Sequence, residues 1–191
     1  MSKARASERL IDLPNLLSLS RIPLAAVPWL APTSLELLLA CMVVAGLTDW
    51  LDGLAARRAA GGTPLSSTGA WLDPLCDKVF VASAAVLVVA THPVPLWLLP
   101  VVLARDLLQA ALFAVYLGSR LRRWIRYDYT AGKLGKATTV AQFLVIAAIA
   151  ADLTTWVVPL AWVACALGVA AAGDYGRRAL DALRHPVRPD R

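Results

Sequence analysis

Six long apolar runs dominate this sequence of 191 residues. Hydrophobic residues make up 59% of the chain and charged residues 17%, and the mean hydropathy is +0.63. The runs cover residues 14–31, 35–58, 67–90, 95–119, 134–151 and 154–175. Since about 20 apolar residues are enough for a helix to cross a bilayer, we predict an all-α integral membrane protein with six transmembrane helices.

Turn-forming clusters separate most of these runs. They are Ala31–Ser34, Gly61–Pro64 and Thr91–Pro95, and a short junction at Asp152–Thr154 joins the last two runs. Short loops leave no room for a separate soluble domain. We therefore predict one membrane domain over residues 1–191, with a short basic N-terminal segment at 1–12 and a C-terminal tail at 178–191.

The distribution of Lys and Arg predicts the orientation of the helices. Basic residues precede the first run and end the second. Others lie between the fourth and fifth runs or at the start of the fifth, and the last ones follow the sixth. The three loops at Ala31–Ser34, Thr91–Pro95 and Asp152–Thr154 carry no Lys or Arg. Because short cytoplasmic loops are rich in Lys and Arg, both termini should be cytoplasmic in a multi-pass protein of the cell membrane. The net charge of +6 favours contact with anionic lipids, and nothing in this pattern indicates nucleic acid.

Four carboxylates lie where the second and third runs meet. Asp49 and Asp52 are three residues apart, Asp73 and Asp77 are four apart, and each pair therefore shares one face of a helix. If these helices are antiparallel neighbours, all four carboxylates gather near the cytoplasmic end. Oxygen-only ligands favour hard cations such as Mg²⁺, Mn²⁺ or Ca²⁺. Two carboxylates on each helix could hold a pair of them, which suggests phosphoryl-type chemistry.

The sequence around these aspartates resembles the signature of the CDP-alcohol phosphatidyltransferase family. That signature is D-x-x-D-G-x-x-A-R, a spacer, and G-x-x-x-D-x-x-x-D. All eight fixed positions are matched here, by Asp49, Asp52, Gly53, Ala56, Arg57, Gly69, Asp73 and Asp77. The spacer is longer than is usual in the family. Three further segments, Pro14–Arg21, Ala104–Asp106 and Gly135–Gln142, resemble other family segments in the same order.

This resemblance implies transfer of a phosphatidyl group from CDP-diacylglycerol to an alcohol, with release of CMP, by a six-helix protein that is usually a homodimer. It implies two divalent cations, Mg²⁺ or Mn²⁺, held by Asp49, Asp52, Asp73 and Asp77, with Asp77 also acting as general base. On the predicted topology, this active site faces the cytoplasm. The residues implied to bind the CDP moiety are Asp49, Asp52, Gly53, Ala56, Arg57 and Gly69.

Four basic residues are candidates for binding the acceptor alcohol, because a phosphorylated acceptor needs positive charge. They are Arg21, Arg105, Lys133 and Lys136. The alternative is that they anchor the protein to lipid head groups, and that Asp106 is the ion-pair partner of Arg105.

Several short segments resemble CMP-forming cardiolipin synthases slightly more than other members, so phosphatidylglycerol is the first predicted acceptor. These segments are Ser18, Arg21, Ala45–Thr48, Arg105–Asp106 and Tyr175–Arg177. The alternative acceptor is glycerol 3-phosphate, as in phosphatidylglycerophosphate synthase, followed by inositol phosphate and serine.

A different class, the ion-coupled membrane transporter, would also use intramembrane carboxylates. It predicts acidic residues near the bilayer midplane and two similar halves with broken helices. The sequence has neither feature, which favours the enzyme.

Overall fold

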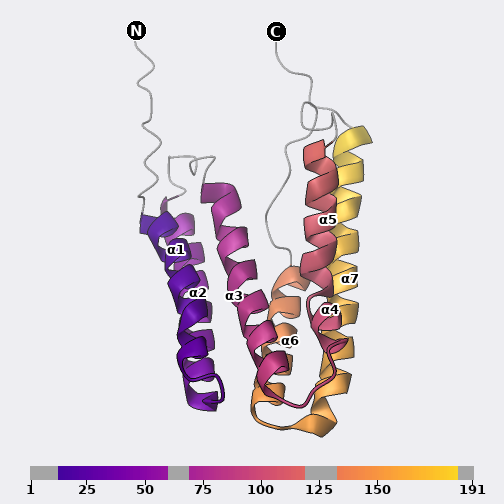
Figure 1. Cartoon of the computed structure of the whole chain (residues 1–191). Helices are drawn as coiled ribbons and strands as arrows, with labels where there is room; N and C mark the ends of the chain where they lie inside the picture. The colour runs from indigo at the N-terminus through magenta and orange to yellow at the C-terminus, as the bar shows by residue number, and fades with distance from the viewer. Residues whose placement is uncertain (1–12, 60–68, 119–132, 185–191) are drawn as a thin grey trace. The chain divides into compact units, whose positions relative to one another are not determined.

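The computed structural model describes residues 13–59, 69–118 and 133–184, and every regular element in these ranges is a helix (Figure 1). Side chains at the borders of the ranges, including those of Asp49, Asp52 and Asp73, lie outside the description, as does the predicted turn at Gly61–Pro64. The predicted all-α class is confirmed. The chain divides into two compact units, Met1–Leu87 and Val88–Arg191, which are described separately below.

The first unit contains α1 (Leu13–Ala26), the 3₁₀ helix η1 (Val27–Leu30), α2 (Leu35–Ala59) and most of α3 (Gly69–Thr91). Helix α1 packs against α2, and η1 contacts both. Buried apolar side chains form the core of this unit. They include Ala25, Leu38, Met42, Phe80 and Ala84.

The first predicted run forms α1 followed by η1, because the α-helix tightens into a 3₁₀ turn where Pro28 occurs. A proline disfavours α-helical geometry at the preceding residue, and the last carbonyls of a helix need partners from elsewhere. Ser83 of α3 supplies one by donating to the Ala25 carbonyl oxygen at 3.0 Å, and Trp29 Nε1 donates to Ser83 Oγ at 2.9 Å. These bonds join α3 to the end of α1.

Helix α2 begins at Leu35, directly after Ser34, which is the last residue of the predicted turn at Ala31–Ser34. The Leu37 backbone N–H donates to Ser34 Oγ at 3.2 Å, which satisfies one of the free donors of the first helical turn. The predicted boundary between the first two runs is therefore confirmed and has a local physical cause.

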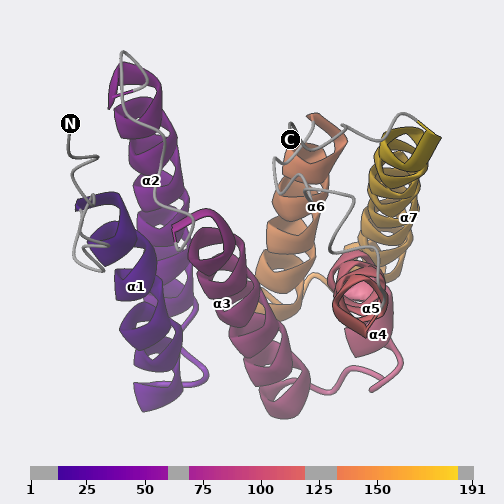
Figure 2. The ribbon, with the colours of Figure 1, turned by 90° about the horizontal axis from the view of Figure 1, so that it is seen from above.

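The second unit contains α4 (Leu98–Val102), α5 (Ala104–Gly118), α6 (Lys133–Ala150) and α7 (Thr154–Arg184). Helix α7 packs against α4, α5 and α6. Seen from above, α5, α6 and α7 form a triangular group (Figure 2). Helices α6 and α7 contact each other, and both contribute buried side chains to the core, such as Val145 and Ile146 of α6 and Ala161 and Ala164 of α7.

The fourth predicted run is broken into α4 and α5 at Leu103, which has φ −89° and ψ 9°. Next to the break, Gln142 Nε2 of α6 donates to the Val102 carbonyl oxygen at 2.9 Å. A side chain that binds into the backbone ladder of a helix is a known cause of a kink. The single predicted helix over 95–119 is therefore corrected to two shorter ones.

Helix α7 is longer than the apolar run that predicted it, since it continues from residue 175 to Arg184. Its 31 residues correspond to about 46 Å at about 1.5 Å per residue. Asp174 and Arg178 form an ion pair of 2.7 Å across one turn of the helix, and the Arg178 guanidinium lies over the Tyr175 ring. Hydropathy marks only the apolar part of a helix, whereas helix-forming residues and such pairs extend it further.

One described helix, Thr154–Arg178 within α7, is long and apolar enough to cross a membrane. Two shorter apolar helices, Leu35–Thr48 and Leu134–Ala150, fall below that length. This result concerns the described residues only. The six spans and the cytoplasmic location of both termini therefore stay predictions.

The predicted junction of the last two runs forms a tight turn between α6 and α7. The Leu153 N–H donates to the Ala148 carbonyl oxygen at 2.9 Å and the Asp152 N–H to that of Ile149 at 3.1 Å, the bond pattern of a Schellman motif. Asp152 has a φ of 54°, which is the left-handed conformation that this motif requires and that glycine adopts most easily.

We predict that Asp152→Gly leaves the protein as stable or stabilises it, whereas Asp152→Val lowers the free energy of unfolding by about 1–2 kcal/mol. A β-branched side chain is poorly tolerated at positive φ. Thermal unfolding of the purified protein in one detergent measures both variants. Equal melting temperatures for the Gly and Val variants would contradict this account of the turn.

Candidate functional site

The two halves of the aspartate motif lie on consecutive helices. Asp49, Asp52 and the motif residues Gly53, Ala56 and Arg57 belong to the C-terminal part of α2, and α3 begins at Gly69 and carries Asp73 and Asp77. The spacings of three and four residues are therefore helical spacings, as predicted. Only the Asp77 side chain of the four is described; it is partly buried and has an interaction partner. Convergence of the four carboxylates stays a prediction.

Arg21 lies in the interior of the first unit, next to the start of this motif. Its side chain is 1% exposed, and its Nε donates a long hydrogen bond of 3.4 Å to Thr48 Oγ1. Thr48 in turn donates to the Ala45 carbonyl oxygen at 2.8 Å and directly precedes Asp49 in α2. Such burial does not fit a residue that anchors to lipid head groups, so Arg21 is an internal cation next to the aspartate motif.

Arg105 is a second internal cation, near the start of α5. It is 7% exposed, and its Nη1 donates to the Gly135 carbonyl oxygen at 2.9 Å and to Thr139 Oγ1 at 2.7 Å. Its Nε is buried without a hydrogen-bond partner. Both acceptors are neutral, and no carboxylate among the described residues pairs with it. A buried cation without a counter-charge is costly unless an anion reaches it.

The predicted ion pair between Arg105 and Asp106 does not form. Asp106 Oδ2 instead accepts a hydrogen bond of 2.8 Å from Gln142 Nε2 of α6. Adjacent residues on a helix point about 100° apart and do not face each other. The two side chains therefore reach different groups of the same neighbouring helix, and this expectation was wrong.

Gly168 of α7 allows the close approach on which the position of Arg105 depends. A Cβ atom at residue 168 would lie 2.9 Å from Arg105 Cβ and 3.2 Å from its backbone nitrogen, closer than van der Waals contact permits. The other two acceptor candidates are at the start of α6. Lys136 is exposed, and the Lys133 side chain lies outside the description.

Sequence reasoning from charge alone missed the neutral residues that hold these arginines. Thr48 accepts a hydrogen bond from Arg21, and Thr139 accepts one from Arg105. Gln142 donates to the Val102 carbonyl oxygen, close to Arg105 in the chain. The available signal was their polarity, since polar residues inside apolar helices usually bond to another helix. Gln142 is 1% exposed and Thr138 fully buried.

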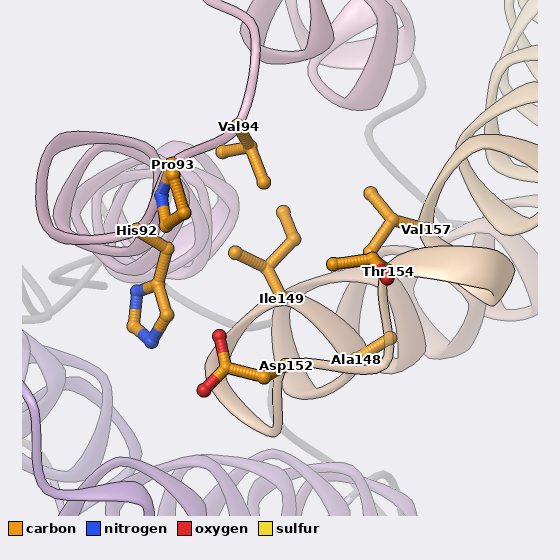
Figure 3. A pocket seen from close by; sticks show the side chains of 8 residues that line it. All are labelled: His92, Pro93, Val94, Ala148, Ile149, Asp152, Thr154 and Val157. Carbon is orange, nitrogen blue, oxygen red and sulfur yellow. The ribbon is translucent and has the colours of Figure 1, made fainter.

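A small pocket in the second unit lies where the segment after α3 meets the turn between α6 and α7 (Figure 3). His92 and Asp152 are among the residues that line it, and its volume is about 10 Å³. That is the limit for a single water molecule. His92 Nδ1 also contacts the Val88 carbonyl oxygen at 3.2 Å, so the ring belongs to the local packing rather than to a substrate site.

These features define a helical, strongly apolar protein with an acidic motif split over two helices and internal arginines. The sequence profile of the CDP-alcohol phosphatidyltransferase family matches residues 11–170. The chain belongs to the CDP-alcohol phosphatidyltransferase family. The predicted family is thereby confirmed, and an enzyme family is established in place of the ion-coupled transporter.

Relatives with two different names match the chain. It is 36% identical over 143 residues to a cardiolipin synthase (CMP-forming) of Streptomyces coelicolor, covering 70% of this chain and 62% of that protein. It is 40% identical over 110 residues to a CDP-diacylglycerol–glycerol-3-phosphate 3-phosphatidyltransferase of Pseudomonas fluorescens, covering 53% and 54%. A second enzyme of that name, from Arabidopsis thaliana, is 32% identical over 157 residues, covering 73% and 60%. The chain thus matches between 54% and 62% of the length of these relatives.

We predict that Gly168→Ala destabilises the protein by about 1–3 kcal/mol, because the added methyl group overpacks the contact with Arg105. Gly173→Ala in the same helix is the matched control, since a Cβ there meets nothing within 4 Å. Alanine should be neutral or stabilising at residue 173. Melting temperatures in detergent compare the two, and equal shifts would contradict the close packing at residue 168.

Proposed function

We propose that this protein transfers the phosphatidyl group of CDP-diacylglycerol to an alcohol and releases CMP, in glycerophospholipid biosynthesis. The observation that carries the proposal is the complete eight-position motif, with its two halves on the consecutive helices α2 and α3 of a chain that belongs to this family. The acceptor proposed first is phosphatidylglycerol, which would give cardiolipin, and the second is glycerol 3-phosphate.

The four aspartates fit a pair of hard divalent cations, because all donors are carboxylate oxygens and each helix supplies two at helical spacing. We propose Asp49, Asp52, Asp73 and Asp77 as the ligands of two Mg²⁺ or Mn²⁺ ions. When bound, these ions would neutralise the diphosphate and stabilise the departing CMP.

The chain's own residues then have separate roles. Asp77 accepts the proton of the acceptor hydroxyl as that oxygen bonds to the lipid-side phosphorus, and the bond from this phosphorus to the oxygen of CMP breaks. Arg57 suits the diphosphate, because its planar guanidinium binds phosphate oxygens in pairs. Gly53, Ala56 and Gly69 leave space for the nucleotide, since none has a side chain larger than a methyl group.

We propose that the protein crosses the cell membrane six times, with both termini and the active site on the cytoplasmic side. Residues 92–94 line one pocket together with Asp152 and Thr154 of the turn between α6 and α7, so two of the three loops that carry no Lys or Arg lie at one end of the second unit. Lys133, Lys136, Arg177 and Arg178 belong to the opposite helix ends, as the distribution of positive charge in membrane proteins favours. Contacts with anionic lipids and a homodimeric state are further proposals from charge and family.

For the acceptor, we propose that Arg21, Arg105, Lys133 and Lys136 provide the positive charge. The burial of Arg21 and Arg105 supports this role, and so does the absence of a carboxylate partner for Arg105 among the described residues. Phosphatidylglycerol and glycerol 3-phosphate both carry a phosphate close to the reacting hydroxyl. The name of the Pseudomonas fluorescens relative contains glycerol 3-phosphate, and that of the Streptomyces coelicolor relative contains cardiolipin, the product proposed here for phosphatidylglycerol.

We expect membranes containing the protein to release CMP from CDP-diacylglycerol when Mg²⁺ or Mn²⁺ and the right alcohol are present. Each candidate acceptor is supplied separately, and both CMP and the lipid product are measured. Chelation of divalent cations should stop the reaction, because uncompensated diphosphate charge opposes attack. Product with phosphatidylglycerol alone supports cardiolipin synthesis, and product with glycerol 3-phosphate alone supports the alternative. No CMP with any acceptor contradicts the proposed function.

We predict that Asp77→Asn reduces turnover by at least about 10²-fold, because the amide cannot accept the proton from the attacking hydroxyl. Asp174→Asn is the matched control, since it makes the same chemical change in an exposed ion pair of α7. Turnover and melting temperature are measured for both variants. Normal turnover in the Asp77→Asn variant would show that Asp77 is not the general base.

A further inference from the structure

Helix α6 provides two hydrogen-bond acceptors for one nitrogen of the Arg105 guanidinium. The Nη1 nitrogen donates to the Gly135 carbonyl oxygen at 2.9 Å and to Thr139 Oγ1 at 2.7 Å. Bonds from a charged donor are stronger than neutral ones, and the bond to Gly135 is buried while the bond to Thr139 is partly buried. They set the direction of a long side chain that would otherwise have many rotamers.

The hydroxyl of Thr139 is itself oriented by the helix that carries it. Thr139 Oγ1 donates to the Gly135 carbonyl oxygen at 3.3 Å, so its single hydrogen points along α6 and its lone pairs are left for Arg105. A threonine hydroxyl has one donor and two acceptor positions. This arrangement uses the donor within the helix and one acceptor for the guanidinium.

One turn further along α6, Gln142 engages the neighbouring charge. Its Nε2 donates to Asp106 Oδ2 at 2.8 Å and to the Val102 carbonyl oxygen at 2.9 Å. The carboxylate next to Arg105 in the sequence is thereby held by a neutral amide. Helix α6 thus keeps the cation and the anion of α5 on separate partners, and the charge of Arg105 is not cancelled by Asp106.

We propose that Thr139 is a positioning residue for the acceptor, acting through Arg105. By accepting from Nη1, it fixes the guanidinium so that the remaining donors stay available to the phosphate of an anionic acceptor. Gln142 supports this by keeping the Asp106 carboxylate engaged. The inference rests on the proposed function for its biological meaning, but the link between Thr139 and Arg105 is tested separately below.

The chain supplies a matched control in the adjacent residue. Thr138 makes the same bond within the helix, from its Oγ1 to the Leu134 carbonyl oxygen at 2.8 Å, whereas the described acceptors of Arg105 are Gly135 and Thr139. Thr139→Val and Thr138→Val therefore remove the same hydroxyl from neighbouring positions. Thr139→Ser restores the hydroxyl and should restore the wild-type behaviour.

In steady-state assays with the acceptor that wild type uses, we expect Thr139→Val to raise the KM for that acceptor about tenfold, as loss of a bond to a charged group would. The KM for CDP-diacylglycerol should stay unchanged, and Thr138→Val should change neither constant. Equal effects of the two valine variants, or an effect of Thr139→Val on CDP-diacylglycerol alone, overturn the proposal.

A double-mutant cycle shows whether Thr139 acts through Arg105. In an Arg105→Gln background, Thr139→Val should cause no further increase in the acceptor KM. Additive effects would mean that Thr139 contributes independently, and they would overturn the positioning role. The melting temperatures of all variants are also measured. A purely structural effect of Thr139→Val would lower the melting temperature and would raise the acceptor KM in the Arg105→Gln background as well.

Binding of inorganic phosphate and of glycerol 3-phosphate, measured by calorimetry without CDP-diacylglycerol, separates this inference from the proposed function. Weaker binding by Thr139→Val, and not by Thr138→Val or Thr139→Ser, supports the positioning role even if no acceptor yields CMP. Equal binding by wild type and all three variants, or no binding by wild type, overturns it.

Discussion

The burial of charged side chains among apolar helices is the constraint on which the rest of this structure depends. Arg21 and Arg105 are almost fully buried, and isolated buried charge is costly. Among the described residues, Arg105 donates to two neutral oxygens of α6, the Gly135 carbonyl and Thr139 Oγ1, and one partner of Arg21 is Thr48 Oγ1 of α2. Bonds to neutral oxygens spread the charge of Arg105 without cancelling it, which supports the proposal that it binds a phosphate-bearing acceptor.

The backbone is adapted to these polar contacts at specific points. Gly168 lets α7 approach the backbone at Arg105, and the break at Leu103 lies where Gln142 binds the Val102 carbonyl. These features add little apolar burial of their own. Their value is that they determine where α5 and α6 place their polar side chains.

The family signature and the residues proposed to bind the acceptor lie on different parts of the chain. The aspartate motif lies on α2 and α3, and relatives with two different enzyme names match this chain. We therefore propose that residues outside the motif select the acceptor. The cations and neutral hydrogen-bonding groups of α1, α5 and α6 are of the right chemical kind, because both candidate acceptors carry phosphate.

The sequence by itself determined the helical class, the family and the approximate bounds of α2, α3 and α6, because apolar length, turn-forming residues and motif spacing are local properties. Only the tertiary structure decided the partners of Arg105 and Asp106 and the break at Leu103. The reason is physical: Gln142 and Thr139 lie more than thirty residues away in the sequence, and no local pattern encodes which helix a long polar side chain reaches. Adjacent charges suggested an ion pair, but helix geometry pointed them to different partners.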